Sequence, residues 1–224
     1  MQFEEELARV LPQDLPNRER LISLGGKHLQ MISVANEYMN LTRIVSPQEA
    51  AIKHVFDCVA PWRFFESSAR VLDVGTGAGF PGIPLAIILP QVRFTLAESI
   101  GKKARFVESV IDALDLSNAA VIADRAESAS ATQRADVITA RAVAPIDRLI
   151  TLFQKPLNAG IRLLLFKGPD VETEMAEGKM GRIRGQVLCR YDLPEGFGSR
   201  ALVELKLRGA ERAMLRKQAR ANRQ

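Results

Sequence analysis

The strongest constraint on the fold is a glycine-rich turn between an apolar strand and an apolar helix. Residues 73–82 read DVGTGAGFPG. They follow the apolar pair Val71-Leu72 and precede the apolar run Ile83–Leu89. Glycine adopts backbone conformations that other residues avoid, and it lets a ligand approach the backbone closely. A strand that turns through glycines into a helix therefore predicts a ligand site at the turn.

The spacing within this turn distinguishes two kinds of ligand. The sequence from Gly77 to Gly82 matches the dinucleotide pattern G-x-G-x-x-G. In a dinucleotide site, however, the first glycine directly follows the strand, and that glycine is Gly75, which puts Phe80 in the third glycine slot. Asp73 would repel a pyrophosphate but suits a ligand with an ammonium and a sulfonium group. We therefore favour S-adenosylmethionine (SAM) over a nicotinamide dinucleotide, and a tight turn without a ligand stays a third possibility.

Composition places the chain among ordinary globular proteins. It has 224 residues, 47% of them hydrophobic and 25% charged, which fits one domain with a small appendage. The acidic N-terminus does not resemble a secretory signal, and no apolar run is long enough to span a membrane. Cys58 and Cys189 have no metal-ligand spacing, so we expect a reduced, cytoplasmic setting and no metal site.

The hydrophobic pattern divides the chain into three segments. Residues 1–69 read as an N-terminal helical cap, in which Gly25-Gly26 interrupts the helical pattern and Ser46-Pro47 begins a new helix. Residues 70–208 alternate between strands and helices. Residues 209–224 form a basic tail compatible with a phosphate backbone. Its cationic residues are Arg212, Arg216, Lys217, Arg220 and Arg223.

The alternating segment predicts an α/β fold with a doubly wound, mainly parallel, Rossmann-like sheet. Strands are expected at 71–74, 92–97, 119–123, 137–140, 161–166, 186–191 and 201–207. Helices are expected at 83–89, 102–114, 146–154 and 171–177, and a short segment at 125–129 follows the third strand. Because little helix separates the last two strands, an antiparallel strand is expected at the end. Ligands of such sheets bind beyond the carboxyl ends of the strands, where Glu98, Arg141 and Lys167 lie.

Six sequence strings give the chain a specific resemblance. They are NLTRI (Asn40–Ile44), KHVFDC (Lys53–Cys58), DVGTGAGFPGIPLA (Asp73–Ala86), ESIGKKARF (Glu98–Phe106), ARAVAP (Ala140–Pro145) and FKG (Phe166–Gly168). The chain resembles, from about residue 20 to 208, the bacterial 16S ribosomal RNA guanine-N7 methyltransferases, also called the glucose-inhibited division protein B family. It departs from the family pattern at Glu98, where aspartate is common, and at Ala140, where serine is common.

The resemblance implies a SAM-dependent class I methyltransferase that acts on N7 of the guanine at position 527 of 16S ribosomal RNA. The implied partner is 16S RNA in the 30S subunit. We expect a monomer, with no membrane or DNA partner. The expected cofactor-binding residues are Asp73 and Gly77 from the turn, and Gly75, Phe80, Glu98 on the ribose, Ala126, Glu127 and Arg141 from the resemblance. The candidate RNA contacts are Lys53, His54, Lys102, Lys103 and Lys167.

The predicted reaction needs few catalytic groups. Guanine N7 offers a lone pair in the ring plane, so its attack on a methyl group needs orientation more than a base. Arg141 and His54 are the only candidates for a catalytic role. Three alternatives stay open: a methyltransferase for a small molecule or protein, a nicotinamide-dependent oxidoreductase, and a non-catalytic RNA- or ribosome-binding protein with a vestigial SAM fold.

Overall fold

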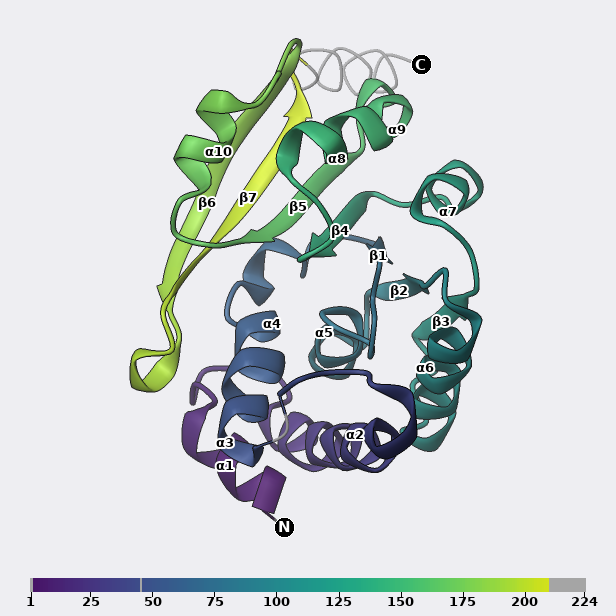
Figure 1. Ribbon diagram of the computed structural model, residues 1–224, viewed down its shortest axis with the longest axis vertical. Helices are drawn as coiled ribbons and strands as arrows, with labels where there is room; N and C mark the ends of the chain where they lie inside the picture. Colours follow the sequence, from purple (N-terminus) through teal and green to yellow (C-terminus); the bar gives the residue numbers. More distant parts are fainter. Residues whose placement is uncertain (1, 45, 210–224) are drawn as a thin grey trace, which may run out of the picture.

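The computed structural model describes residues 2–44 and 46–209, and a seven-stranded sheet runs through its centre (Figure 1). The strand order is β3-β2-β1-β4-β5-β7-β6. The strands are β1 (Arg70–Val74), β2 (Arg93–Ala97), β3 (Ala119–Ile122), β4 (Val137–Arg141), β5 (Arg162–Lys167), β6 (Ile183–Asp192) and β7 (Ser199–Leu207). The basic residues predicted to form a tail, Arg212 to Arg223, lie outside the described residues.

The pairing of the strands confirms the mainly parallel sheet with an antiparallel strand at the end. β1, β2, β3, β4 and β5 pair in parallel, whereas β7 is antiparallel to both β5 and β6. The last two strands form a long hairpin whose tip holds the short helix η3 (Pro194–Gly196). The hairpin brings Ala201, near the start of β7, opposite Lys167 at the end of β5.

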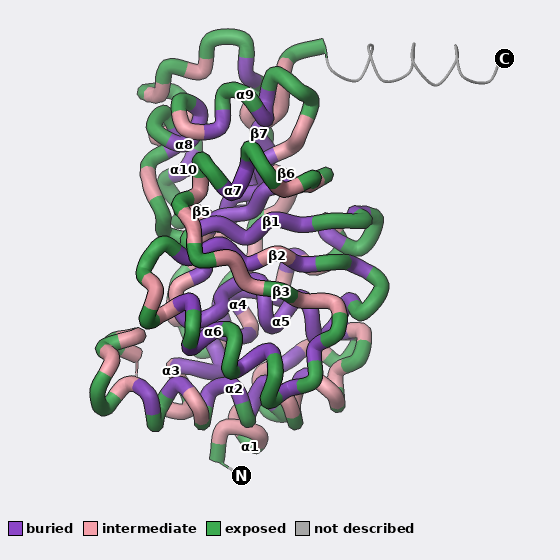
Figure 2. Tube along the Cα trace, turned by 90° about the vertical axis from the view of Figure 1, so that its right-hand side faces the viewer, coloured by how far each residue is buried: buried purple, intermediate pink, exposed green. Residues whose placement is uncertain are grey.

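Helices cover both faces of the sheet, as the alternating pattern predicts. α5 (Gly82–Ile88) and α6 (Gly101–Ala113) lie on the same face as the N-terminal helices. The opposite face carries α7 (Ala126–Thr132), α8 (Ile146–Leu152), α9 (Gln154–Asn158) and α10 (Val171–Glu177). Successive residues of β5 point to opposite faces, so Leu164 joins one apolar cluster and Leu163 and Leu165 join the other. Figure 2 shows the central β1 as buried and the edge strand β3 as more exposed.

The N-terminal helices share an apolar core with the sheet. α1 (Gln2–Val10) packs on α2 (Arg18–Met39), and Leu7, Leu21 and Leu29 belong to the same buried cluster as Leu85 of α5. The predicted interruption at Gly25-Gly26 is wrong, because α2 runs through both glycines without a break. A Cβ atom at Gly25 would come within 3.3 Å of Leu7, so the absent side chain lets α1 approach closely.

A π-helical turn interrupts the next helix, which begins at Pro47 as predicted. The Ser46 side chain accepts a hydrogen bond from the backbone N–H of Glu49 and caps the helix. α3 (Pro47–Ala50) passes into the π turn η1 (Ala51–Phe56) and then α4 (Asp57–Val59), followed by η2 (Trp62–Phe64). The N–H of Asp57 donates to the carbonyl oxygen of Ile52, the i to i+5 bond of a π turn. Such turns are frequent at functional sites, and this one carries Lys53 and His54.

The helix predicted over residues 146–154 is two short helices, α8 and α9. They meet at Phe153, whose φ of −105° and ψ of 23° leave the helical region and whose side chain is fully buried. Pro156 lacks the N–H needed to continue a helix from α8, but it is tolerated in the first turn of α9. Within the described part of the chain, no helix is long and apolar enough to cross a membrane.

The shared core predicts that the helical cap and the sheet unfold together. Replacing the fully buried Leu21 with alanine should lower the free energy of unfolding by about 2–5 kcal/mol, because a cavity forms in that core. Val34 lies on the same helix and is 52% exposed, so Val34→Ala should change the free energy of unfolding by less than about 0.5 kcal/mol. Urea unfolding followed by circular dichroism and by Trp62 fluorescence measures both. Two separate transitions in Leu21→Ala would contradict the shared core.

Candidate functional site

The glycine turn after β1 adopts backbone conformations that require glycine. Gly75, Gly77 and Gly79 have φ angles of 67°, 62° and 100°. The Gly75 N–H donates to the carbonyl oxygen of Ala97 on β2, and the N–H groups of Gly79 and Phe80 donate to Thr76. A Cβ atom on Gly77 would meet no atom within 4 Å, although Gly77 lines a cavity. The turn therefore leaves open space directly above its backbone.

Asp73 holds this turn from below. Its Oδ2 atom accepts hydrogen bonds from the Thr76 hydroxyl at 2.7 Å and from the Gly82 N–H at 2.9 Å, and the residue is fully buried. Burial raises the pKa of Asp73 to about 6, although both hydrogen bonds act in the opposite direction. Oδ1 is buried and has no hydrogen-bond partner among the described residues. Asp73 thus links the end of β1 to the start of α5 and does not line the cavity.

Glu98 supports the turn from the end of β2. Its two carboxylate oxygens accept hydrogen bonds from the N–H groups of Gly77, at 3.0 Å, and Ile100, at 2.8 Å. Ala126 and Glu127 begin α7, beyond the end of the next strand, β3. These three residues lie at the carboxyl ends of neighbouring parallel strands, where ligands of such sheets bind.

A cavity of about 500 Å³ opens between the glycine turn, the helical cap and the ends of β4, β5 and β7. The cap contributes Leu41, Thr42, Ile44, Lys53, His54 and Asp57 to its lining. The sheet and its loops contribute Gly75, Thr76, Gly77, Ala78, Phe80, Arg141, Ala142, Phe166, Lys167, Gly168 and Arg200. This volume is in the range of small-molecule sites.

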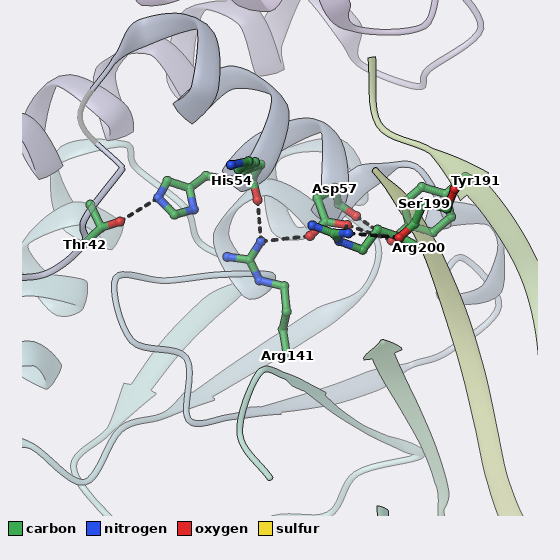
Figure 3. Close-up of polar contacts among 8 residues, drawn as sticks. Thr42, His54, Asp57, Arg141, Tyr191, Ser199 and Arg200 are labelled. Atoms are coloured by element: carbon green, nitrogen blue, oxygen red, sulfur yellow. Dashed lines mark hydrogen bonds and ion pairs between the residues drawn. The ribbon is translucent and has the colours of Figure 1, made fainter. Parts of the chain in front are cut away.

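Arg141 joins the cap to the sheet at the edge of this cavity (Figure 3). Its Nη1 atom donates to the carbonyl oxygen of Lys53 at 2.7 Å and to Oδ2 of Asp57 at 3.2 Å. Its guanidinium also lies over the Phe80 ring, 5.3 Å from the centroid. Burial opposes the charge of Arg141, but the neighbouring Asp57 is among the groups that raise its pKa, so it stays a cation.

Asp57 binds two further side chains from the C-terminal hairpin. The Tyr191 hydroxyl donates to Oδ1 of Asp57 at 2.9 Å, and Nε of Arg200 lies 3.9 Å from the same oxygen (Figure 3). Burial is the main cause that raises the pKa of Tyr191. The phenol therefore stays protonated and serves as a donor to the carboxylate.

Three stacked rings lie between the cap and the glycine turn, and two of them, His54 and Phe80, line the cavity. His54 stacks on Phe80 with 4.7 Å between ring centroids, and His28 stacks on Phe80 at 4.8 Å. His28 Nε2 donates to the carbonyl oxygen of Ala78 at 2.8 Å, and His54 Nε2 lies 3.0 Å from the Thr42 hydroxyl. Burial lowers the pKa of His28 to about 4 and, with the nearby Arg141, that of His54 to about 3. Both imidazoles are therefore neutral at pH 7.

The structure gathers some of the residues singled out from the sequence and leaves others apart. Those that line the cavity are Gly75, Gly77, Phe80, Arg141, Lys53, His54 and Lys167. Those outside its lining are Asp73, Glu98, Ala126, Glu127, Lys102 and Lys103. The last two begin α6, next to the end of β2. His54 is buried and neutral, which suits a ring wall better than a charged contact with phosphate.

Sequence reasoning missed His28, Tyr191 and Arg200. His28 lies on α2 below the glycine turn, 50 residues from its partner Ala78. Tyr191 is 134 residues from Asp57 and reaches it only because the hairpin of β6 and β7 folds against the cap. No local spacing marks these contacts.

The sequence of the chain also matches a known protein family. The model of the family described as rRNA small subunit methyltransferase G matches residues 23–186. A protein of Solibacter usitatus named ribosomal RNA small subunit methyltransferase G is 52% identical over 210 residues, 92% of this chain and 100% of the relative. The protein of the same name from Symbiobacterium thermophilum is 38% identical over 220 residues, 91% and 88% of the two chains.

Solved structures share the fold at low sequence identity. An O-methyltransferase from Bacillus cereus, solved in complex with SAH, aligns with a TM-score of 0.53 and 18% identity. The alignment covers 80% of this chain and 91% of that one. This likeness shows the Rossmann-like fold of SAM-dependent methyltransferases.

The buried stack predicts that neither histidine becomes charged near neutral pH. His28 and His54 are the chain's two histidines, and NMR of their imidazole resonances should show no titration between pH 5.5 and 8. The histidines of the unfolded chain become protonated below about pH 6.5, whereas those of the folded chain stay neutral. Protonation of these two residues therefore lowers the free energy of unfolding as the pH falls from about 6.5 toward about 4. The raised pKa of Asp73 acts in the opposite sense between about 3.8 and 6, so NMR is the sharper measurement. A midpoint near 6.5 for His54 would contradict the neutral stack.

Proposed function

The chain belongs to the rRNA small subunit methyltransferase G family, and we propose that it transfers the methyl group of SAM to N7 of the guanine at position 527 of 16S ribosomal RNA. The observation that carries this proposal is the family match over most of the chain, together with a cavity bounded by the glycine turn. We place the reaction in the cytoplasm, on RNA of the 30S subunit and with the protein as a monomer.

The open glycine turn supports SAM as the methyl donor. Gly75 and Gly77 leave their backbone accessible to the cavity, and a side chain at Gly77 would project into free space that a ligand can fill. Phe80 and Arg141 would form the wall beside the cofactor, and Glu98 would accept the ribose hydroxyls next to Gly77. Ala126 and Glu127 would meet the adenine end. Asp73 would act indirectly, by holding the turn in its binding conformation.

The chemistry of the site supports an in-line transfer without a general base. SAM supplies an electrophilic methyl group on a positively charged sulfur. Guanine N7 carries no proton, so no side chain has to remove one. The chain's contribution would be to orient both reactants and exclude water, which can supply about 7–11 kcal/mol of the barrier reduction. A neutral His54 avoids adding positive charge beside the sulfonium.

The cavity residues suggest which cations meet the RNA. Lys53 and Lys167 line the cavity, and we propose that both face the target nucleotide, with His54 in the wall behind it. Lys102 and Lys103 begin α6 outside the cavity, and we propose that they contact the RNA backbone farther from the target base. Phosphate contacts of this kind position the RNA without reading its sequence.

A direct test uses 30S subunits from a strain that lacks this modification. The protein and radiolabelled SAM should transfer label to one guanine, and chain cleavage at N7-methylguanine should map it to position 527. Subunits that already carry the modification serve as the control and should accept no label. Label on another atom or another nucleotide would contradict the proposed specificity, and label on ribosomal protein would favour a protein substrate.

The glycine turn provides a test of the cofactor site. Gly77→Ala should weaken SAM binding at least about tenfold, because the new methyl group enters the space proposed for the cofactor. Gly160→Ala is the matched control, since Gly160 also has positive φ, at 89°, and open space but lies between α9 and β5. Both variants place alanine at a positive φ, so a difference between their SAM affinities reports on the position of the residue in the site and not on backbone strain. Isothermal titration calorimetry measures the affinity, and equal SAM affinities would remove Gly77 from the site.

A further inference from the structure

The wall of the cavity carries more cations than carboxylates. Four cationic side chains line it, namely Lys53, Arg141, Lys167 and Arg200. Asp57 is the one carboxylate in the lining contributed by the described residues. Because His54 is neutral, the local charge depends on how each of the four cations is paired.

The two lysines are compensated by nearby glutamates. Lys53 forms an ion pair with Glu49 one helical turn away, and its ammonium group lies 4.9 Å from the centroid of the Phe197 ring. Lys167 forms an ion pair with Glu174 at 2.8 Å and donates to the carbonyl oxygen of Ala144 at 3.0 Å. Neither lysine therefore adds uncompensated charge to the wall.

The two arginines share the single carboxylate of Asp57, so one positive charge is left over. Arg141 holds the closer contact, 3.2 Å against 3.9 Å for Arg200, and it also binds the Lys53 carbonyl oxygen. Within the described chain, the hydrogen bond of Arg200 is the one from Nη1 to the Ser199 carbonyl oxygen, at 2.9 Å. The Arg200 side chain is also the more exposed, at 27% against 17%. The uncompensated charge therefore falls on Arg200.

Arg200 lies on the side of the cavity away from the glycine turn. Its neighbour Ala201 pairs with Lys167 at the end of β5, and three steps in the sheet separate β7 from β1. At about 4.8 Å for each step, β7 lies about 14 Å from β1. A cofactor seated on the glycine turn leaves this outer side of the cavity to the second reactant.

From this uncompensated charge and its position, we infer that Arg200 binds a phosphate oxygen of the RNA nucleotide that enters the cavity, an inference that rests on the proposed function. The guanidinium matches the geometry of a phosphate with two parallel donors. Because Nε faces Asp57, the donors that remain for this role are Nη2 and the second N–H of Nη1. Asp57 then orients both arginines, Arg141 toward the cap and Arg200 toward the substrate. Tyr191 fixes Asp57 from the hairpin side.

Steady-state methylation of 30S subunits and equilibrium binding of the same subunits test this role. Arg200→Gln should raise both the KM and the Kd for 30S subunits about tenfold or more, because a charge-assisted hydrogen bond is lost. The slope of log binding constant against log salt concentration should become shallower by about 0.7, the value of one phosphate contact on single-stranded RNA. Arg200→Lys should restore part of the lost affinity and part of the salt dependence, since lysine keeps the positive charge but lacks the two parallel donors of the guanidinium.

Arg184→Gln is the matched control. Arg184 is exposed on β6, the partner strand of β7, and does not line the cavity, so this variant removes the same charge from the same hairpin. It should bind and methylate 30S subunits as the wild type does. The affinity of Arg200→Gln for SAM, measured by calorimetry, should stay within about twofold of the wild type and shows that the site is folded.

Two results would overturn the inference. One is an Arg200→Gln variant with the 30S affinity and salt slope of the Arg184→Gln control. The other is a variant that loses SAM affinity instead of 30S affinity, which would assign Arg200 to the carboxylate of the cofactor. Failure of the proposed function is seen separately, as wild-type protein that binds 30S subunits without methylating them.

Discussion

The contact on which the site depends most is the buried carboxylate of Asp57. It meets Arg141 from β4, and Tyr191 and Arg200 from the C-terminal hairpin, so it joins the cap helix to two distant parts of the sheet. A buried carboxylate is costly without partners, and removing one partner of a buried ion pair typically costs about 3–5 kcal/mol. The three segments therefore have to meet in one arrangement, and that arrangement gives the cavity its wall between the cap and β7.

A second buried carboxylate, Asp73, organises the opposite side of the cavity. Its hydrogen bonds to Thr76 and Gly82 close the glycine turn between β1 and α5, and Glu98 fixes the Gly77 N–H from the neighbouring strand. The two aspartates differ in their partners. Asp57 forms ion pairs with arginines, whereas Asp73 accepts hydrogen bonds from neutral donors, and burial raises the pKa of Asp73 to about 6. The side of the cavity that we propose for the cofactor is thus shaped by backbone, and the side that we propose for the substrate is shaped by charge.

The mechanism proposed for this site needs position more than acid–base chemistry, and its side chains agree with that need. His28 and His54 are stacked on Phe80 and neutral, and Tyr191 stays protonated. The π turn in the cap helix places His54 and Asp57 against the cavity and presents the Lys53 carbonyl oxygen to Arg141. The polar groups nearest the cavity therefore hold one another in place, which favours a rigid wall around two oriented reactants.

The sequence by itself determined the alternating strands and helices, the antiparallel strand at the end and the glycine turn, because these depend on local spacing and on glycine's backbone freedom. It misjudged α2 at Gly25-Gly26 and the helix after β4, where packing against Leu7 and the burial of Phe153 decide the local shape. Only the tertiary structure brought Tyr191 and Arg200 to Asp57, since contacts across more than 130 residues leave no periodic signal. It also decided which predicted cations are already paired, because the charge of a site depends on neighbours in space.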